Sequence, residues 1–410
     1  MEFRFTPQQI AFRQEVRDFC QKEFPPEVLK RAYRGSPGGY HSAEIKKKFV
    51  DKGWYVVHWP KELGGCGLTP IELTTFHEEI GYHYVTAQAQ ITMAENIRVF
   101  GSEQQKQYFL PRFARGEIDF ILGISEPNVG VDAANIQCRA DPVGDHWVLN
   151  GRKMWGGSGL PGAMKTAWSW LIVRTDQNLP RHRGLSIIMV DMNTPGIEVR
   201  PVNVMGSDKR LGDKESPVAA VFYDNVKIPK ENLLGEVNKG WYQLMAGLDV
   251  LRSSMAAGYL GEAHRCLDDT VMYLKTIKGS DRWVADSQVI RHRVAELSAD
   301  IQVLWNLSYH IASLEEKGAD NEAGLVPLSH LASLSKIWST ELVQRVSAFA
   351  VQVLGSYGLL MRPESDKWLP FMISDQYNWM SRYTRQLTIG GGSVEMMRTQ
   401  VAQRNLTLPR

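Results

Sequence analysis

Three polar side chains lie at helical spacing in the stretch that precedes Gly101. Gln88, Thr92 and Glu95 are four and then three residues apart, so a helix here would present all three on one face. A carboxylate that is held close to its target and away from water can accept a proton as a general base. The same spacing also allows a surface ion pair between Glu95 and Arg98 at the i+3 position.

A carboxylate and a guanidinium group share a second helical face. Asp249 and Arg252 lie three residues apart on one predicted helix. They could contact a polar ligand together, or they could form an exposed ion pair that adds little to stability. The spacing alone leaves both interpretations open.

Helix and strand signals divide the chain into three parts. Thr6-Pro7-Gln8-Gln9 has the form of a helix start, and further helices are expected from near Pro70 and from Thr86 to Val99. From about residue 119 to 235, short segments rich in tryptophan, valine and isoleucine alternate with turn residues, which predicts an antiparallel β domain. Long stretches with wide apolar faces follow and predict a helix bundle.

We therefore expect an α+β fold with three domains. Residues 1–118 form an N-terminal α-helical domain, residues 119–236 a barrel-like antiparallel β domain, and residues 237–410 a C-terminal four-helix bundle. No GxGxxG segment follows a strand, which argues against a Rossmann dinucleotide-binding unit.

The composition narrows the class of protein. A net charge of +2 without a basic stripe argues against a nucleic-acid partner, and no apolar run is long enough to predict a membrane span. The N-terminal residues resemble neither a signal peptide nor a transit peptide. The cysteines are scattered and form no CxxC, which is typical of a reduced cytoplasmic protein without a metal site or disulfides; they are Cys20, Cys66, Cys138 and Cys266.

Four motifs occur in the chain. Leu122–Asp132 contains Ser-Glu-Pro, Leu149–Trp155 contains Asn-Gly-Arg-Lys-Met-Trp, Gln352–Gly358 ends in Gly-Ser-Tyr-Gly, and Gly391–Arg398 begins with Gly-Gly-Ser. The first two resemble the Ser/Thr-Glu-Pro signature and the Asn-Gly-x-Lys-x-Trp strand of the acyl-CoA dehydrogenase family. The third is similar to the family's bundle motif that reaches a neighbouring subunit's FAD, and the fourth is similar to its C-terminal segment. The motifs occur in family order over nearly the whole chain. The resemblance implies FAD as cofactor, an acyl-CoA thioester as substrate, and an electron-transfer flavoprotein or similar electron acceptor.

The resemblance also assigns site residues. The cofactor-binding positions it implies are Gly123, Ile124, Ser125, Trp155, Gly157, Gln352, Gly355 and Glu395. The substrate-binding positions it implies are Gln88, Thr92, Val131, Asp249 and Arg252, the last two as contacts to CoA. Taken by themselves, Ser125 and Trp155 could equally be a turn serine and a core tryptophan.

The family's usual catalytic glutamate is absent. Gly391 stands at its position in the C-terminal motif, and Leu251 stands where a subset of relatives keeps it. The family also polarises the thioester oxygen through the backbone N–H at the first of these positions, and Gly391 retains that amide. Members that oxidise cyclic enoyl-CoA substrates by 1,4-elimination use a carboxylate from the region of Glu95, which makes Glu95 the candidate replacement base. Asp132 and Glu395 are weaker candidates.

The leading hypothesis is an FAD-dependent enzyme that acts on a bulky or cyclic acyl-CoA by proton abstraction and hydride transfer to flavin N5. Two alternatives stay open. One is a CoA-ester flavoprotein that catalyses desulfination, decarboxylation or reduction, and the other is a partner subunit of a mixed tetramer that lacks the base. A homotetramer is the other expected assembly. His83 falls where relatives that handle a second carboxylate carry an arginine. It could contact a polar acyl tail, but a surface histidine is the expectation.

Overall fold

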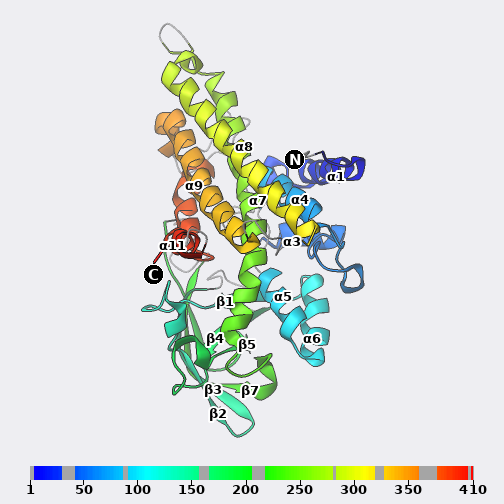
Figure 1. Ribbon diagram of the computed structural model, residues 1–410, viewed down its shortest axis with the longest axis vertical. Helices are drawn as coiled ribbons and strands as arrows, with labels where there is room; N and C mark the ends of the chain where they lie inside the picture. Colours follow the sequence, from blue (N-terminus) through cyan, green and yellow to red (C-terminus); the bar gives the residue numbers. More distant parts are fainter. Residues whose placement is uncertain are drawn as a thin grey trace. The chain divides into compact units, whose positions relative to one another are not determined.

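The protein is described here by a computed structural model. It describes residues 4–29, 42–85, 91–156, 166–205, 218–279, 283–318, 327–359, 376–404 and 408–409, and for residues 91, 247–253 and 404 it describes the backbone alone. The chain forms two compact units (Figure 1). The bundle unit comprises Met1–Arg31, Leu68–Ala87 and Arg252–Arg410, and the sheet unit comprises Ala32–Gly67 and Gln88–Leu251.

Long helices form the bundle unit. They are α1 (Pro7–Glu23), α4 (Pro70–Tyr82), α8 (Gln288–Glu316), α9 (Leu328–Leu354), α10 (Gln376–Tyr383), α11 (Val394–Arg404) and the part of α7 (Gly240–Leu274) from Arg252 onward. The predicted helix start at Thr6 is confirmed, because its hydroxyl accepts from the Gln9 amide and the Gln9 side chain accepts from the Thr6 amide. Thr69 caps α4 in the same way.

Glycines allow α4 and α7 to cross in backbone contact. A β-carbon at Gly81 would lie 2.2 Å from the carbonyl oxygen of Gly258, and one at Gly261 would lie 2.0 Å from the carbonyl oxygen of Glu78. These separations are far below any van der Waals contact, so residues with side chains are excluded at this crossing.

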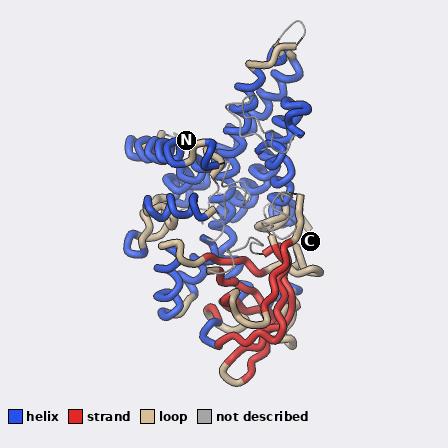
Figure 2. The backbone as a smooth tube through the Cα atoms, turned by 180° about the vertical axis from the view of Figure 1, so that it is seen from behind, coloured by secondary structure: helices blue, strands red, loops and turns tan. Residues whose placement is uncertain are grey.

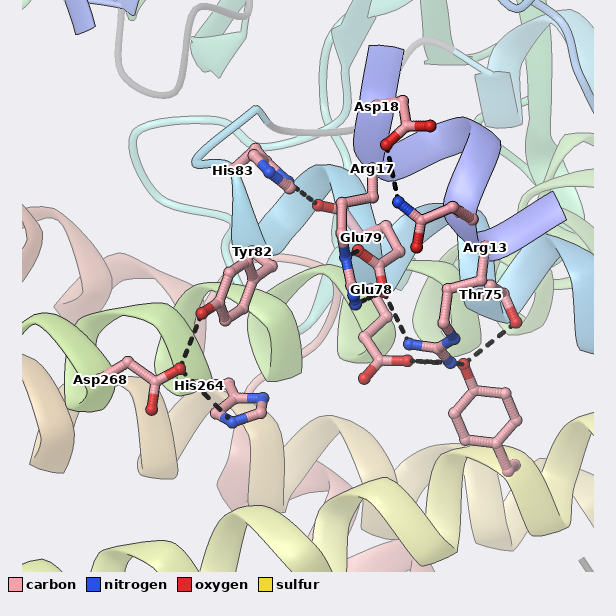
Figure 3. Close-up of polar contacts among 12 residues, drawn as sticks. Arg13, Arg17, Asp18, Thr75, Glu78, Glu79, Tyr82, His83, His264 and Asp268 are labelled. Carbon is pink, nitrogen blue, oxygen red and sulfur yellow. Dashed lines mark hydrogen bonds and ion pairs between the residues drawn. The ribbon is translucent and has the colours of Figure 1, made fainter. Parts of the chain in front are cut away.

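A buried charged cluster fastens α1 to α4 and α8 (Figure 3). Arg13 donates to Glu79 at 2.8 Å and to Glu78 at 2.9 Å, and the Tyr309 hydroxyl of α8 donates to Glu78 at 2.6 Å. His83 lies close to this cluster, and the prediction that it is a surface residue is wrong. Its ring is buried, Nδ1 donates to the Glu79 carbonyl, and burial lowers the pKa of the imidazole.

The sheet unit combines a mixed sheet with short helices. The helices are α3 (Ala43–Lys52), α5 (Ile91–Phe100) and α6 (Glu103–Ala114). The strands are β1 (Asp119–Gly123), β2 (Arg139–Val143), β3 (His146–Gly156), β4 (Ala167–Arg174), β5 (Leu185–Asp191), β6 (Ile197–Pro201), β7 (Ala219–Pro229) and β8 (Leu233–Leu234). They pair in the order β6-β7-β3-β2-β4-β5-β8, with β1 beside β4, and Figure 2 shows them in red.

The fold class expected from the sequence is confirmed, but the sheet is mixed. Most strand pairs are antiparallel as predicted, whereas β1 and, at a single residue pair, β2 each pair with β4 in parallel. No tight hairpin joins β4 to either strand, so local turn signals do not determine their relative direction. The predicted helix before Gly101 is present from Ile91, and its expected first residues, 86–90, lie outside the described part of the chain. The domain boundaries at residues 118 and 236 stay predictions.

Candidate active site

A short loop after β1 carries three of the predicted flavin contacts. Gly123 ends the strand, and Ile124 and Ser125 follow it with partly exposed side chains. A β-carbon at Gly123 would lie 2.5 Å from Cδ1 of Leu171, so a larger residue here would require the Leu171 side chain to move. The loop is tied to β3 because the Met154 amide donates to the Ser125 carbonyl at 2.8 Å.

A buried ion pair between Lys153 and Glu126 fixes the position of this loop. Nζ of Lys153 donates to Oε1 of Glu126 and to the carbonyl oxygen of Ile124, both at 2.9 Å. Glu126 also accepts from the amides of Gln137 and Cys138 at 2.9 Å each. Burial lowers the pKa of Lys153, which Glu126 partly opposes. The pair explains why the Leu122–Asp132 motif contains a glutamate and the Leu149–Trp155 motif a lysine. Their contact holds the Ser125 loop against β3.

Trp155 points out of the sheet at the end of β3. Its indole is 54% exposed, and its φ of 65° lies in the left-handed region that only glycine adopts without strain. The register between β3 and β7 shifts between Met154 and Gly156, which marks a bulge at this point. The alternative in which Trp155 is a core residue is therefore excluded. Gly157 lies outside the described residues.

These residues fit a flat heteroaromatic group such as the flavin ring of FAD. Ser125 offers a hydroxyl on a rigid loop, and the Met154–Ser125 backbone bond brings that loop beside the strand that ends in the exposed indole of Trp155. An exposed aromatic face beside fixed polar groups is the combination that a planar cofactor needs.

Glu95 lies on α5 within a cluster of charged and ionisable side chains. Its carboxylate is 16% exposed, and it accepts from Nε of Arg98 at 2.8 Å and lies 3.1 Å from Nε2 of His58. Burial pushes the pKa of Glu95 upward, but the contacts with His58 and Arg98 outweigh it, so the pKa lies below its usual value. The expected contact with Arg98 is therefore present. Thr92 on the same helix is half-buried, and Gln88 lies outside the described residues.

Sequence reasoning missed His58. It comes from the loop between α3 and α4, where no motif or periodicity marks it. Its only signal is the fold itself, which brings it to a helix 37 positions further along the chain.

Gly391 occupies a turn before α11 in the bundle unit. Its φ is +72°, and a β-carbon built on it meets no atom within 4 Å. A β-carbon at this position would therefore meet no obstacle among the described residues, but the left-handed backbone favours glycine. Glu395, in the first turn of α11, is exposed, and hydrogen bonds from its own backbone amide and from Ser393 lower its pKa.

Among the residues that the structure describes, the remaining predicted positions form no further cluster. Gln352 is exposed near the end of α9, and Gly355 caps that helix with a φ of 57°. Val131 is exposed, and the weaker base candidate Asp132 accepts from Arg181 at 2.8 Å. The side chains of Leu251, Asp249 and Arg252 lie outside the described part of the chain, so the proposed CoA contacts remain predictions. The Ser125 loop, Trp155 and Glu95 belong to the sheet unit, whereas the C-terminal residues belong to the bundle unit.

Comparison with known protein families identifies the family of the chain. Residues 6–117 match the acyl-CoA dehydrogenase N-terminal domain, residues 122–225 its middle domain, and residues 238–406 its C-terminal domain. The chain belongs to the acyl-CoA dehydrogenase family. Members of this family are FAD-dependent oxidoreductases that act on acyl-CoA thioesters.

Relatives match over the full length. Acyl-CoA dehydrogenase FadE29 of Mycobacterium tuberculosis is 29% identical over 99% of this chain and 98% of its own. A solved structure named Tcur3481-Tcur3483 steroid ACAD has a TM-score of 0.86 at 28% identity and covers 100% of both chains. The ChsE4-ChsE5 complex of Mycobacterium tuberculosis has a TM-score of 0.82 at 28% identity, also with 100% of both chains covered. Within the described residues, no helix has the length and apolarity needed to cross a membrane.

Proposed function

We propose that the protein oxidises the CoA thioester of a bulky, ring-containing acyl group, with Glu95 as the proton acceptor, and passes the electrons to an electron-transfer flavoprotein or a similar acceptor. When bound, FAD supplies the acceptor for the hydride. The observation that carries the proposal is the shielded, ionised carboxylate of Glu95 on α5, in a chain with glycine at position 391 and leucine at position 251. A similar solved structure is named as a steroid enzyme, which supports a polycyclic acyl group.

The electrostatics of Glu95 bear on the substrate class. His58 and Arg98 hold its pKa below the usual value, so the group is ionised at neutral pH and needs no prior deprotonation. A carboxylate of lowered pKa is also a weak base, and proton transfer is efficient only when donor and acceptor are matched. Glu95 is therefore suited to a proton made acidic by conjugation, as in a cyclic enoyl thioester that reacts by 1,4-elimination.

Replacement of Glu95 by glutamine tests the assignment. Because general-base catalysis contributes about 10²- to 10⁴-fold, Glu95→Gln should lower turnover of ring-containing enoyl-CoA esters by at least about 10²-fold. Flavin absorbance should be retained. The matched control is Glu103→Gln, which removes an exposed carboxylate paired with Lys106 in the same unit. Full activity in Glu95→Gln would exclude Glu95 as the base.

A second function, that of a base-less subunit in a mixed tetramer, is favoured by a separate observation. One similar solved structure is named as a complex, ChsE4-ChsE5, and another carries a double name, Tcur3481-Tcur3483. In such an assembly the partner chain would supply the base. If this function holds, the purified chain is colourless or inactive and gains activity only when a partner chain is added. A yellow protein that turns over alone rules it out.

A further inference from the structure

A buried lysine lies against the Gly391 turn. Lys336 on α9 is 1% exposed, and its ammonium group donates to the carbonyl oxygen of Gly392. The hydroxyls of Ser339 and Thr340 donate to the carbonyl oxygen of Lys336 and fix the backbone of α9 at this point. Removing an ammonium group from water costs several kcal/mol. Contacts of this kind must offset that cost for the lysine to stay charged at this position.

The turn itself presents a row of backbone donors. Gly391 and Gly392 have φ values of 72° and 101°, and Ser393 leads into α11. The amides of these three residues donate to no acceptor within the part of the chain that the structure describes. Successive N–H groups in such a turn form a concave site that attracts negative charge, and the positive end of the α11 dipole adds to it.

Lys336 constrains the direction of one of these donors, the N–H of Ser393. In a planar peptide the C=O and N–H bonds point to opposite sides. Because the Gly392 carbonyl is held toward α9, the N–H of Ser393 must point away from α9. The same ammonium group places a full positive charge behind the turn, in a region from which water is largely excluded, where charge interactions are stronger than in solvent.

We propose that Lys336 is a positioning residue for the thioester carbonyl oxygen. It orients the Gly392 peptide of the donor turn, and its charge stabilises the negative charge that develops on that oxygen when the conjugated acyl group loses a proton. The inference rests on the proposed function and on the contact between the Gly391 amide and that oxygen that the family resemblance implies. It adds a side chain from a different helix to the substrate-activating machinery.

A pair of matched ligands tests this role in the FAD-loaded protein. One ligand is an acyl-CoA thioester, and the other is the thioether with CH₂ in place of the carbonyl group. Dissociation constants are measured from the change in flavin absorbance. Lys336→Met should weaken thioester binding by about tenfold or more while changing thioether binding by about twofold at most, since only the thioester carries the oxygen. Ser347→Ala, a buried polar position further along α9, should change neither constant.

The outcomes separate the two hypotheses. Equal weakening of both ligands by Lys336→Met would show a purely structural role and overturn the inference. A wild-type protein that binds neither ligand would instead refute the proposed function. If Lys336→Met does not fold or retain flavin, Lys336→Gln, which keeps a donor without the charge, is judged by the same ratio. An unchanged ratio, or failure of both variants to fold, counts against the proposal.

Discussion

The ammonium group of Lys153 lies 2.9 Å from the carboxylate of Glu126, and both side chains are buried under the loop that carries Ser125. Two motifs that are separate in the sequence are thus joined by this ion pair in the structure. The lysine of the β3 motif holds the glutamate of the loop motif and the Ile124 carbonyl at once. Replacement of either partner should therefore lower the free energy of unfolding and weaken flavin binding.

Lys153→Met should lower the free energy of unfolding by about 3–5 kcal/mol, because it leaves Glu126 as an uncompensated buried charge. Denaturant unfolding monitored by circular dichroism measures this loss, and the ratio of flavin to protein absorbance measures retention of FAD. The control is Lys106→Met, which breaks the exposed pair with Glu103 and should cost at most about 1 kcal/mol. Equal stability losses in the two variants would contradict the role given to the buried pair.

Glu262 on α7 should make the protein less stable as the pH rises. Its carboxyl group is 7% exposed, and burial raises the pKa of Glu262 to about 8. The folded state thus keeps a proton that the unfolded chain releases above about pH 4.5. Between these pH values the free energy of unfolding falls with pH, by about 1.4 kcal/mol per pH unit for one proton. Chemical unfolding at a series of pH values measures the slope.

Glu262→Gln should remove this contribution, because an amide does not titrate. Relative to the wild type, the variant should therefore gain stability at pH 8 compared with pH 5. A difference between the two proteins that stays constant over this range would show that Glu262 does not hold its proton in the folded state.

His58→Phe should shift the pH dependence of catalysis. His58 is one of two side chains that lower the pKa of Glu95, so its removal should raise that pKa toward the usual value. The acid limb of kcat/KM, which reports the base of the free enzyme, should move to higher pH. His146→Phe, at the exposed pair with Asp145, is the matched control and should leave the limb in place. If the acid limb of kcat/KM does not move in His58→Phe, the group that titrates in that limb is not Glu95.

Gly81→Ala should destabilise the bundle unit by about 1–3 kcal/mol, the usual cost of overpacking. The added methyl group would meet the Gly258 carbonyl of α7, a backbone atom that cannot rotate away. At Gly130 an added β-carbon meets no atom within 4 Å, so Gly130→Ala serves as the control and should be nearly neutral. Thermal unfolding measures the melting temperatures of the two variants, and that of Gly81→Ala should be the lower. Equal melting temperatures would refute the close contact between α4 and α7.

Local patterns predicted much of the fold. The cap at Thr6 and the end of α5 before Gly101 depend on a few neighbouring residues, so the sequence is sufficient to locate them. The parallel pairing of β1 with β4 and the burial of His83 depend on segments that meet only after folding. No periodicity in one segment contains that information.

The candidate site shows the same division. Trp155 and Ser125 could be singled out because motif and spacing mark them. The contact of His58 with Glu95 and that of Lys336 with the Gly392 carbonyl could not, because each joins distant parts of the chain through side chains that are common in unrelated roles. The pKa of Glu95 depends in part on one such contact, which is why the sequence predicted a candidate base but not its strength.

The left-handed backbone at Trp155 has a kinetic consequence. A non-glycine residue in this region stores about 1–3 kcal/mol of strain, which the folded chain already carries through the bulge and the bond between Met154 and Ser125. The backbone at Trp155 therefore does not have to rearrange when a planar ring arrives. Cofactor uptake at this strand should proceed at a rate set by encounter, with no slow reorganisation step after it, and the stored strain is the equilibrium cost of that readiness.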